Sequence, residues 1–428
     1  MKKLLTFALA AILAVGCCFG IVSCGNTSSG DTEKPYNGIV KVENLADIKV
    51  GLICLHGESS TYDKNFIDAF NAACTAKGVK SVTKVDIPES SACYDAAADL
   101  VDQGCNIIFA DSFGHEEHML KAAKEFPEVQ FCHATGTYAH TEKRGNFHNA
   151  FASIYEGRYL AGIAGGMKLK EMIENNQLKP ENYDANGNVK VGYVGAWTYA
   201  EVISGFTSWF LGVRSIVPNV VMDVQFTGSW YDETAEKTAA ELLINEKHCA
   251  LISQHADSMG APTACETAGV PNVSYNGSTA TACPKTFVAS SRINWQPYFE
   301  YIIDCVNKGE EISVDYCAGI GSTWSNGSVA LTDLGTAAAT GTQEAIDAAI
   351  AELKAGTLKV FDLSKFKVDG NALADDFKAD VDTDAQFTAD TVVIKTAGDI
   401  KYFAESEFRS APYFGLKIDG ITYLNEKY

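Results

Sequence analysis

The sequence is poor in positive charge. Its 428 residues include 34 Lys and Arg against 54 Asp and Glu, which gives a formal net charge of −20. A surface of this charge repels phosphate backbones and anionic lipid headgroups. Nucleic-acid binding and charge-driven adhesion to membranes are therefore excluded from the leading hypotheses.

The sequence also lacks the short motifs of common catalytic sites. It has no Gly-x-Ser-x-Gly, no His-Glu-x-x-His, no Gly-Lys-Ser/Thr phosphate loop, and no Gly-x-Gly-x-x-Gly after the first expected strand. Of its eight histidines, only His115 and His118 share an expected helix face. Two glutamates between them are more typical of a solvated helix start than of a metal site. We therefore predict no catalytic residues, no metal and no cofactor.

Cysteine is plentiful, but no Cys-x-x-Cys pair occurs. Ten of the 13 cysteines follow residue 50 at scattered spacings, mostly in apolar runs such as 52–55. A buried cysteine behaves as a small hydrophobic side chain. We favour free thiols in the core over a set of disulfides, and the spacing argues against a structural zinc site.

Residues 1–23 have the character of an export signal. Two lysines precede the apolar run 4–22, which ends in Ile-Val-Ser-Cys at Cys24. This ending resembles the bacterial lipobox, which implies cleavage after residue 23 and a diacylglyceryl group on Cys24. Cys17 is the alternative cut site, and an uncleaved anchor is the alternative interpretation, since the run is nearly long enough to span a bilayer.

Strand and helix patterns alternate from residue 48 onward. Strands are expected at 48–55, 82–87, 106–110 and 129–133, with helices at 65–77, 92–103 and 115–126. After a helix at 156–169, the pattern restarts with strands at 189–195, 220–226, 250–253, 273–275 and 286–289 and helices at 202–215, 232–245, 259–268 and 295–307. Such alternation builds parallel sheets with helices on both faces. We therefore predict an α/β fold with two similar, doubly wound parallel-sheet lobes.

The predicted division of the chain follows this repeat. A Ser/Thr/Gly-rich tether covers 24–44, the first lobe covers 45–160 and the second covers 161–289, with part of 290–335 returning to the first lobe. Residues 336–428 contain an Ala-rich helix and short strand-like pieces in a polar background. We interpret them as an extension packed on the lobes rather than as a third catalytic domain.

Aromatic and polar side chains follow the first expected strand. Tyr62 and Phe66 offer ring faces, while Asp63 and Asn65 offer hydrogen-bonding groups. Ligands of open parallel sheets bind beyond the carboxyl ends of the strands, and a ring beside Asp and Asn suits a flat heterocycle. The alternative is that Asp63 caps a helix that opens near Asn65, and the two roles are compatible.

Other strand ends repeat this composition. The third strand of the first half and three strands of the second half are followed by Asp111, Phe113, Trp197, Trp230 and Asp257. Each has a simpler alternative interpretation. Asp111 and Phe113 would belong to an ordinary strand-to-helix turn, and the two tryptophans would fill the interface between the lobes. Asp257 would form a structural pair with His255. We predict that all five contact a ligand.

Eight short segments, in one order, carry a resemblance to a known family. They are Tyr-Asp-Lys-Asn-Phe at 62–66, His-Ala-Thr-Gly at 133–136, Tyr-Leu-Ala-Gly-Ile-Ala-Gly-Gly at 159–166, Lys-Val-Gly-Tyr-Val-Gly-Ala at 190–196, Phe-Leu-Gly-Val-Arg-Ser at 210–215, Ser-Trp-Tyr-Asp at 229–232, Gln-His-Ala-Asp-Ser at 254–258 and Asn-Trp at 294–295. Together they resemble the basic membrane protein (BMP) family of substrate-binding lipoproteins of ABC importers. The resemblance covers about two thirds of the chain, from about residue 48 to 335.

This resemblance implies a bilobal type I periplasmic-binding fold with a hinge. Members of the family mostly bind purine nucleosides or nucleobases, and a few bind other heterocycles such as riboflavin. By position, Asp63 and Asn65 match the polar residues that hold the base or ribose, and Asp111 matches a strand-end contact. Trp197 stands where relatives place an aromatic beside the cleft, and Asp257 lies in a cleft-facing loop.

The chain also departs from the family pattern. Many relatives have an Asp-rich loop where this chain has Tyr-Asn-Gly-Ser at 275–278, and nucleoside binders often carry a lysine where it has Arg292. We include Arg292 among the predicted ligand contacts. The tail from about residue 340 is longer than the family leads us to expect.

The sequence therefore predicts an exported binding protein, monomeric and anchored by lipid on Cys24 to the outer face of the cell membrane or to a periplasmic or outer-membrane leaflet. It would capture a purine-like small molecule and pass it to an ABC permease. Two alternatives remain binding proteins, for a riboflavin-like heterocycle or for a sugar or small peptide. The others are a signalling receptor and an exported hydrolase that uses Asp63 and His255.

Overall fold

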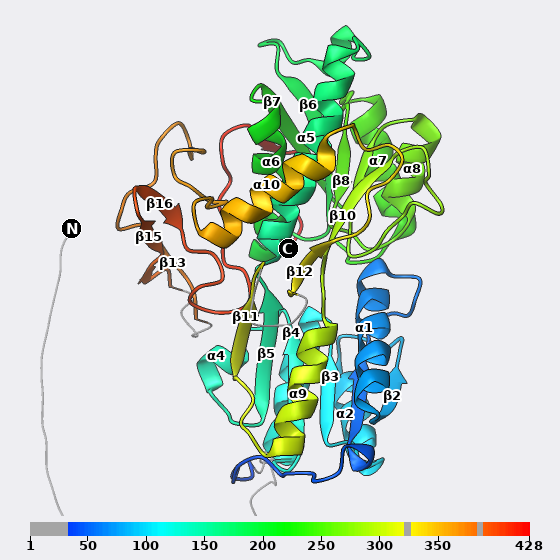
Figure 1. The fold of residues 1–428 in the computed structure, drawn as a ribbon, viewed down its shortest axis with the longest axis vertical. Coiled ribbons are helices and arrows are strands. Elements are labelled where there is room, and N and C mark those ends of the chain that lie inside the picture. Colours follow the sequence, from blue (N-terminus) through cyan, green and yellow to red (C-terminus); the bar gives the residue numbers. More distant parts are fainter. Residues whose placement is uncertain (1–32, 321–326, 383–387) are drawn as a thin grey trace, which may run out of the picture.

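The computed structural model describes residues 33–320, 327–382 and 388–428, so the predicted signal segment and Cys24 lie outside the described residues. Two α/β lobes are stacked along the long axis of the molecule (Figure 1). Over the described residues, no helix combines the length and the apolar character that crossing a bilayer would require.

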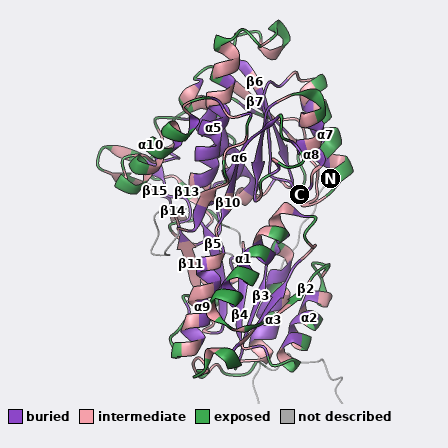
Figure 2. Cartoon of the chain, turned by 45° about the vertical axis from the view of Figure 1, so that its right-hand side comes forward, coloured by how far each residue is buried: buried purple, intermediate pink, exposed green. Residues whose placement is uncertain are grey.

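The first lobe is built on a six-stranded parallel sheet with the order β2-β1-β3-β4-β5-β11. Its strands are β1 (Lys49–Ile53), β2 (Lys80–Lys84), β3 (Ile107–Ala110), β4 (Gln130–Ala134), β5 (Phe147–Ala152) and β11 (Asp315–Ala318). Its helices are α1 (Thr61–Lys77), α2 (Ser91–Asp102), α3 (Glu116–Glu125), α4 (Tyr138–Glu142) and α9 (Gln296–Lys308). Buried strands lie between more exposed helices, as Figure 2 shows, so the core sits on both faces of the sheet.

The second lobe repeats this arrangement. Its seven-stranded sheet has the order β12-β10-β9-β8-β6-β7-β17. The strands are β6 (Val189–Gly195), β7 (Val220–Phe226), β8 (Ile252–Gln254), β9 (Asn272–Tyr275), β10 (Phe287–Ile293), β12 (Val329–Leu331) and β17 (Ile421–Tyr423), and the helices are α5 (Ile154–Glu174), α6 (Ala200–Ile216), α7 (Glu233–Asn245) and α8 (Gly260–Ala268). The order β10-β9-β8-β6-β7 matches β5-β4-β3-β1-β2 of the first lobe. The predicted doubly wound α/β fold with two similar lobes is therefore confirmed.

The chain passes between the lobes after β5, after β10 and between β11 and β12. Consequently α9 and β11, from the stretch 290–335, lie with the first sheet, whereas β12 pairs antiparallel with β10 in the second. The boundary predicted at residue 160 falls inside α5, which packs on α6 and β10 of the second lobe. These three connecting segments between two packed lobes form a hinge.

Helices α5 and α6 meet through glycines. A methyl group on Gly162 would collide with the carbonyl oxygen of Trp209, and one on Gly212 would collide with that of Tyr159. The absence of side chains at both positions lets the two backbones approach closely. The ten cysteines of the described residues are free thiols, and all except Cys317 are buried, in agreement with their predicted use as core side chains.

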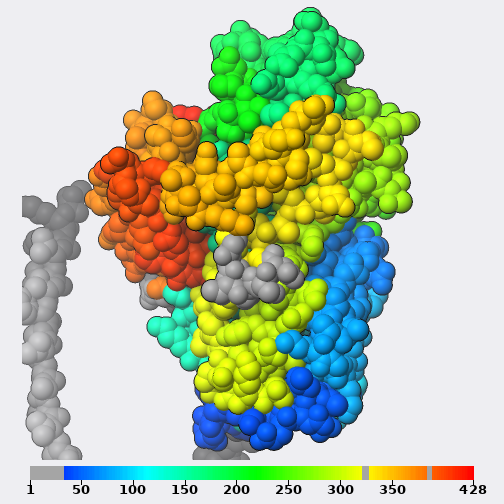
Figure 3. Space-filling model, in the orientation of Figure 1, coloured from blue at the N-terminus to red at the C-terminus, as the bar shows by residue number. Residues whose placement is uncertain are grey.

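The C-terminal residues form one flank of the molecule beside both lobes (Figure 3). They comprise α10 (Thr342–Ala355), β13 (Lys378–Ala379), β14 (Thr391–Val392), β15 (Ile394–Ala397), β16 (Ile400–Phe403) and β17. Strand β17 extends the second sheet by pairing in parallel with β7. Phe361 and Phe414 stack with ring centroids 4.3 Å apart within the core of the second lobe. This region is thus part of the second lobe's core.

Two local expectations were wrong. Helix α1 begins at Thr61, not near Asn65, because Ser60 is the N-cap and its hydroxyl accepts the backbone N–H of Asp63. Strand β5 has no counterpart among the expected strands. Its His148 and Asn149 are fully buried despite their polarity, so hydrophobic periodicity does not reveal it.

Candidate ligand-binding site

A cavity of about 850 Å³ lies between the lobes. Its walls are the loops and helix starts that follow β1, β3 and β4 in the first lobe and β6, β7 and β8 in the second, together with residues of the C-terminal region. In both sheets the strand order reverses where the first strand of the lobe meets the third, β1 with β3 and β6 with β8. Such a reversal opens a crevice at the carboxyl ends of the strands, which is where ligands bind in open α/β sheets.

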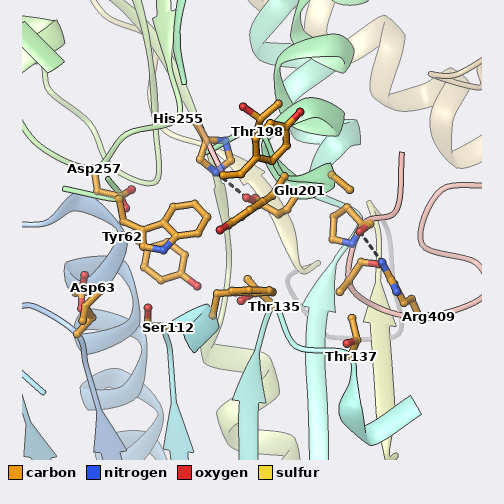
Figure 4. A pocket seen from close by; sticks show the side chains of 18 of the residues that line it. Tyr62, Asp63, Ser112, Thr135, Thr137, Thr198, Glu201, His255, Asp257 and Arg409 are labelled. Atoms are coloured by element: carbon orange, nitrogen blue, oxygen red, sulfur yellow. Dashed lines mark hydrogen bonds and ion pairs between the residues drawn. The ribbon is translucent and has the colours of Figure 1, made fainter. Parts of the chain in front are cut away.

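Asp63 lies at one end of the cavity, in the first turn of α1 (Figure 4). Its carboxylate accepts the backbone N–H of His56 at 2.8 Å, and the His56 ring nitrogen is 3.6 Å from its other oxygen. Burial acts to raise the pKa of Asp63, but hydrogen bonds involving His56 and Ser60 together hold it below its usual range. Asp63 is therefore an ionised hydrogen-bond acceptor.

Asp257 lies at the same end of the cavity, on the second lobe. Its carboxyl accepts a hydrogen bond from the Asn276 amide at 3.2 Å. Burial, followed by the negative charges of Asp63, Glu236 and Glu201, raises the pKa of Asp257 well above its usual range. The two carboxyl groups therefore differ in their environments: hydrogen bonds favour the ionised form of Asp63, whereas burial favours the neutral form of Asp257, which can donate a hydrogen bond.

Asp111, a predicted ligand contact, is fully buried and is not among the residues that line the cavity. Its side chain accepts the Leu55 N–H at 3.2 Å, and its backbone carbonyl accepts the Tyr62 hydroxyl at 2.7 Å. Burial and the charge of Asp63 raise its pKa well above the usual range. Ligand atoms of Cys54, Asp63 and Asp111 lie within 4.8 Å of one another. Burial also raises the pKa of the Cys54 thiol.

Aromatic rings form the walls of the cavity. Tyr62 and Phe113 come from the first lobe, and Tyr199 and Trp230 come from the second. The Phe113 and Tyr199 rings meet across the gap with centroids 5.8 Å apart, and Tyr199 also contacts Trp230 at 6.2 Å. These faces suit a flat ring held between the lobes.

A close contact between His255 and Glu201 forms the floor of the cavity on the side of the second lobe. The His255 ring nitrogen is 2.8 Å from the Glu201 carboxylate, and both residues line the cavity. Behind them the buried Arg158 lies over the Tyr275 ring at 4.2 Å and donates to the Gln254 carbonyl at 3.2 Å. Burial lowers the pKa of Arg158 to about 10, so it remains charged and holds the floor in place.

The structure brings only part of the predicted residue set to this cavity. Its lining includes Tyr62, Asp63, Phe113, Trp230 and Asp257. Trp197 stacks behind Tyr199 with centroids 5.9 Å apart. Phe66 is fully buried against Trp295, at 4.5 Å between centroids, because its position on α1 faces the sheet.

Asn65 and Arg292 line a separate hollow of about 430 Å³. The Asn65 amide donates to the Ile293 carbonyl at 2.9 Å, which ties α1 to the second lobe. The first turn of α1 therefore divides its side chains between two hollows, because neighbouring helical positions point in different directions.

Several lining residues lie outside the predicted set. Those at strand ends are His56, Ser112, Thr135, Thr137, Thr198, Tyr199, Glu201 and His255, and the C-terminal region adds Asp380, Arg409, Ala411, Pro412 and Tyr428. The strand-end rule could have found the first group. No signal in the sequence indicates the C-terminal group, because the position at which a polar, irregular segment packs depends on long-range contacts.

The two-lobed fold with a cavity between the lobes is found in solved solute-binding proteins. A solved ABC transporter solute-binding protein from Conexibacter woesei shares it, with a TM-score of 0.58 at 18% identity, over 73% of this chain and 98% of that one. The family profile described as "Bmp: ABC transporter substrate-binding protein PnrA-like" matches residues 55–321. The chain therefore belongs to the Bmp family of ABC transporter substrate-binding proteins.

Two curated relatives match about half of the chain. A putative ABC transporter glucose-binding protein of Haloferax volcanii is 31% identical over 48% of this chain and 46% of its own length. A purine-binding protein of Brucella abortus is 30% identical over 46% of this chain and 50% of its own length. The chain thus spans about half the length of each curated relative that it matches.

Proposed function

We propose that this protein captures a purine nucleoside or nucleobase between its lobes and delivers it to an ABC permease. The observation that carries the proposal is the position of Asp63 and Asp257, one from each lobe, at the same end of a cavity with aromatic walls. Hydrogen bonds favour the ionised form of Asp63, and burial favours the neutral form of Asp257. A purine edge presents N–H donors next to ring-nitrogen or carbonyl acceptors, so it matches an acceptor beside a donor. The name of the Brucella abortus relative supports the same ligand class.

The role proposed is binding without catalysis. Asp63 and His255 both line the cavity, but His255 is paired with Glu201 at 2.8 Å and Asp63 with His56. Each of the two residues therefore interacts with a partner on its own lobe, and not with the other as a hydrolase using Asp63 and His255 would require. Contacts between the lobes around the cavity fit a protein that closes over its ligand and presents the closed form to a partner.

A sugar is the second candidate ligand. Hydroxyl groups of Ser112, Thr135, Thr137 and Thr198 line the cavity beside the aromatic rings, and the Haloferax volcanii relative is named as a putative glucose-binding protein. Aromatic faces together with polar groups also suit sugar rings. We rank it second because hydroxyl groups alone do not require two carboxyl groups in such different environments at one end of the cavity.

The test is a ligand panel measured by tryptophan fluorescence and isothermal titration with hypoxanthine, inosine, riboflavin and glucose. Trp230→Ala should lower the affinity for the bound heterocycle about 30-fold, since a stacked aromatic contributes roughly 1–3 kcal/mol. Trp209→Phe, in the second lobe's core, is the matched control and should keep the affinity. Binding of glucose alone, or of nothing in the panel, would refute the purine proposal.

We also propose that Cys24, outside the described residues, carries a lipid that holds the protein at the outer face of a membrane. Cys24→Ser should release the protein into the soluble extracellular or periplasmic fraction. Mass spectrometry of the N-terminal peptide should show a diacylglyceryl cysteine in the native protein. An unmodified residue 24, or an intact segment 1–23, would contradict this proposal.

A further inference from the structure

Residues beyond the matched family region reach the ligand cavity. The match ends at residue 321, whereas Asp380, Arg409, Ala411 and Pro412 line the cavity. Arg409 lies at the end opposite Asp63 and Asp257, close to Thr137 (Figure 4). The cavity therefore has a second end whose chemistry is set by the C-terminal region.

The loop that carries Arg409 is held firmly against both lobes. The Arg409 guanidinium donates to the carbonyls of Val381, Ala411 and Pro412 at 3.3, 3.1 and 3.2 Å. The next residue, Ser410, donates its N–H to both carboxylate oxygens of Asp315 on β11, at 3.0 and 3.2 Å. Since the neighbouring Phe414 lies in the second lobe's core, the loop connects that core to the first lobe.

This end of the cavity offers both donors and acceptors. A guanidinium has five N–H donors, and among the described residues Arg409 uses three of them for the loop. Asp380 adds a carboxylate to the lining. Towards the middle of the cavity, the Thr135 hydroxyl donates to the Ala134 carbonyl at 2.6 Å, which leaves its oxygen as an acceptor. A ligand hydroxyl both donates and accepts, so it matches this combination.

The charges around Arg409 disfavour an anion. Burial lowers the pKa of Arg409, and the negative charges of Glu405, Asp380 and Asp315 act in the opposite direction. Even without Glu405, whose own pKa is raised to about 7, Asp380 and Asp315 offset the single guanidinium and leave no net positive field for a phosphate or carboxylate. A neutral group with several hydroxyls is therefore favoured over a charged one.

We propose that Arg409 and Asp380 form a subsite for the hydroxyl-bearing, sugar-like part of the ligand, while Asp63 and Asp257 hold its ring. This inference rests on the proposed function and adds the residues that distinguish a nucleoside from a free base. A buried site built to hydrogen-bond hydroxyls discriminates against an analogue that lacks them.

The experiment compares hypoxanthine with inosine by isothermal titration, because the two share a ring and differ by the ribose. The native protein should bind inosine at least about tenfold more tightly. Arg409→Gln and Asp380→Asn should each remove about tenfold of inosine affinity, the cost of one charged hydrogen bond, and leave hypoxanthine unchanged. Asp380→Asn also keeps the test decisive if Arg409→Gln fails to fold.

Arg214→Gln is the matched control. Arg214 likewise donates to backbone carbonyls of the C-terminal region, at Lys365 and Asp419, but does not line the cavity. It should change neither affinity. Four results would overturn the subsite. Arg409→Gln could lose affinity for inosine and hypoxanthine equally, or Arg214→Gln could lose affinity for inosine selectively. The native protein could also show no preference for inosine over hypoxanthine, or bind inosine 5′-monophosphate more tightly than inosine. Failure of the native protein to bind either purine would instead refute the proposed function.

Discussion

Thr61 of the first lobe donates both its backbone N–H and its hydroxyl to the backbone carbonyl of Asp257 on the second lobe, at 2.9 and 3.2 Å. The contact lies next to the two carboxyl groups at one end of the cavity. It therefore couples the approach of the lobes to the position of a proposed ligand group.

Loss of the Thr61 hydroxyl should weaken the closed form. Thr61→Val keeps the shape and the backbone bond but removes a hydrogen bond of about 1 kcal/mol, so ligand affinity should fall about fivefold. Thr75→Val, at an exposed position of the same helix, should have no effect. Isothermal titration measures both, and equal affinities for the native and Thr61→Val proteins would show that the contact does not stabilise closure.

Replacing each of the two cavity carboxyls should have unequal effects. Asp257→Asn should keep the affinity within about threefold at neutral pH, because a protonated carboxyl and an amide both donate and accept. Asp63→Asn should cost at least about tenfold, because it removes an ionised acceptor. The reverse order in titration calorimetry would contradict the assigned charge states.

The same pair predicts how ligand binding depends on pH. The raised pKa of Asp257 means that its proton is present below that pKa and is lost as pH rises through it. Ionisation removes the donor and places a second negative charge beside Asp63. Affinity should therefore decline as pH rises through the raised pKa of Asp257 in the native protein and stay flatter in Asp257→Asn. Parallel affinity–pH curves would count against a proton on Asp257.

Glu405 should make stability fall as pH rises. Burial raises its pKa to about 7, above the usual value of 4.5. Its contribution is full below the unfolded pKa and is lost as pH rises through the folded one. Relative to Glu405→Gln, the native protein should lose on the order of 2 kcal/mol between about pH 5 and about pH 8. Urea unfolding at each pH measures this, with the exposed Glu407→Gln as control. A native-minus-variant difference that does not change with pH would refute the assignment.

The close approach of α5 and α6 should make Gly162 intolerant of substitution. A methyl group there meets the Trp209 carbonyl oxygen, so Gly162→Ala should reduce the free energy of unfolding by about 2 kcal/mol or more. Gly415→Ala is the control, since that position is exposed and has nothing within 4 Å of an added Cβ. Urea unfolding compares them, and a stable Gly162→Ala protein would mean that the helices can separate freely.

Local sequence patterns determined the α/β class, the repeat of the lobes and the strand ends from which most of the site is built. Short apolar runs such as Ile107–Ala110, within an alternation of strand and helix patterns, favour buried strands. In a parallel sheet the carboxyl ends of such strands meet at one edge. Asp63 and Asp257 were found by that rule. Phe66 was misplaced, because the rule locates a loop but not the helix face that a side chain takes.

Only the tertiary structure decided which strand ends face each other, in which direction the pKa of each carboxyl group shifts, and where the C-terminal region packs. Charge state depends on burial and on neighbours far away in the chain, as Asp257 shows. Arg409 reaches the cavity because β17 pairs with β7 and Ser410 bonds to Asp315, which are long-range contacts without a local signature. Short-range periodicity indicates which face of each segment is buried. The residues that complete a binding site from distant parts of the chain are determined only by the packing of the whole chain.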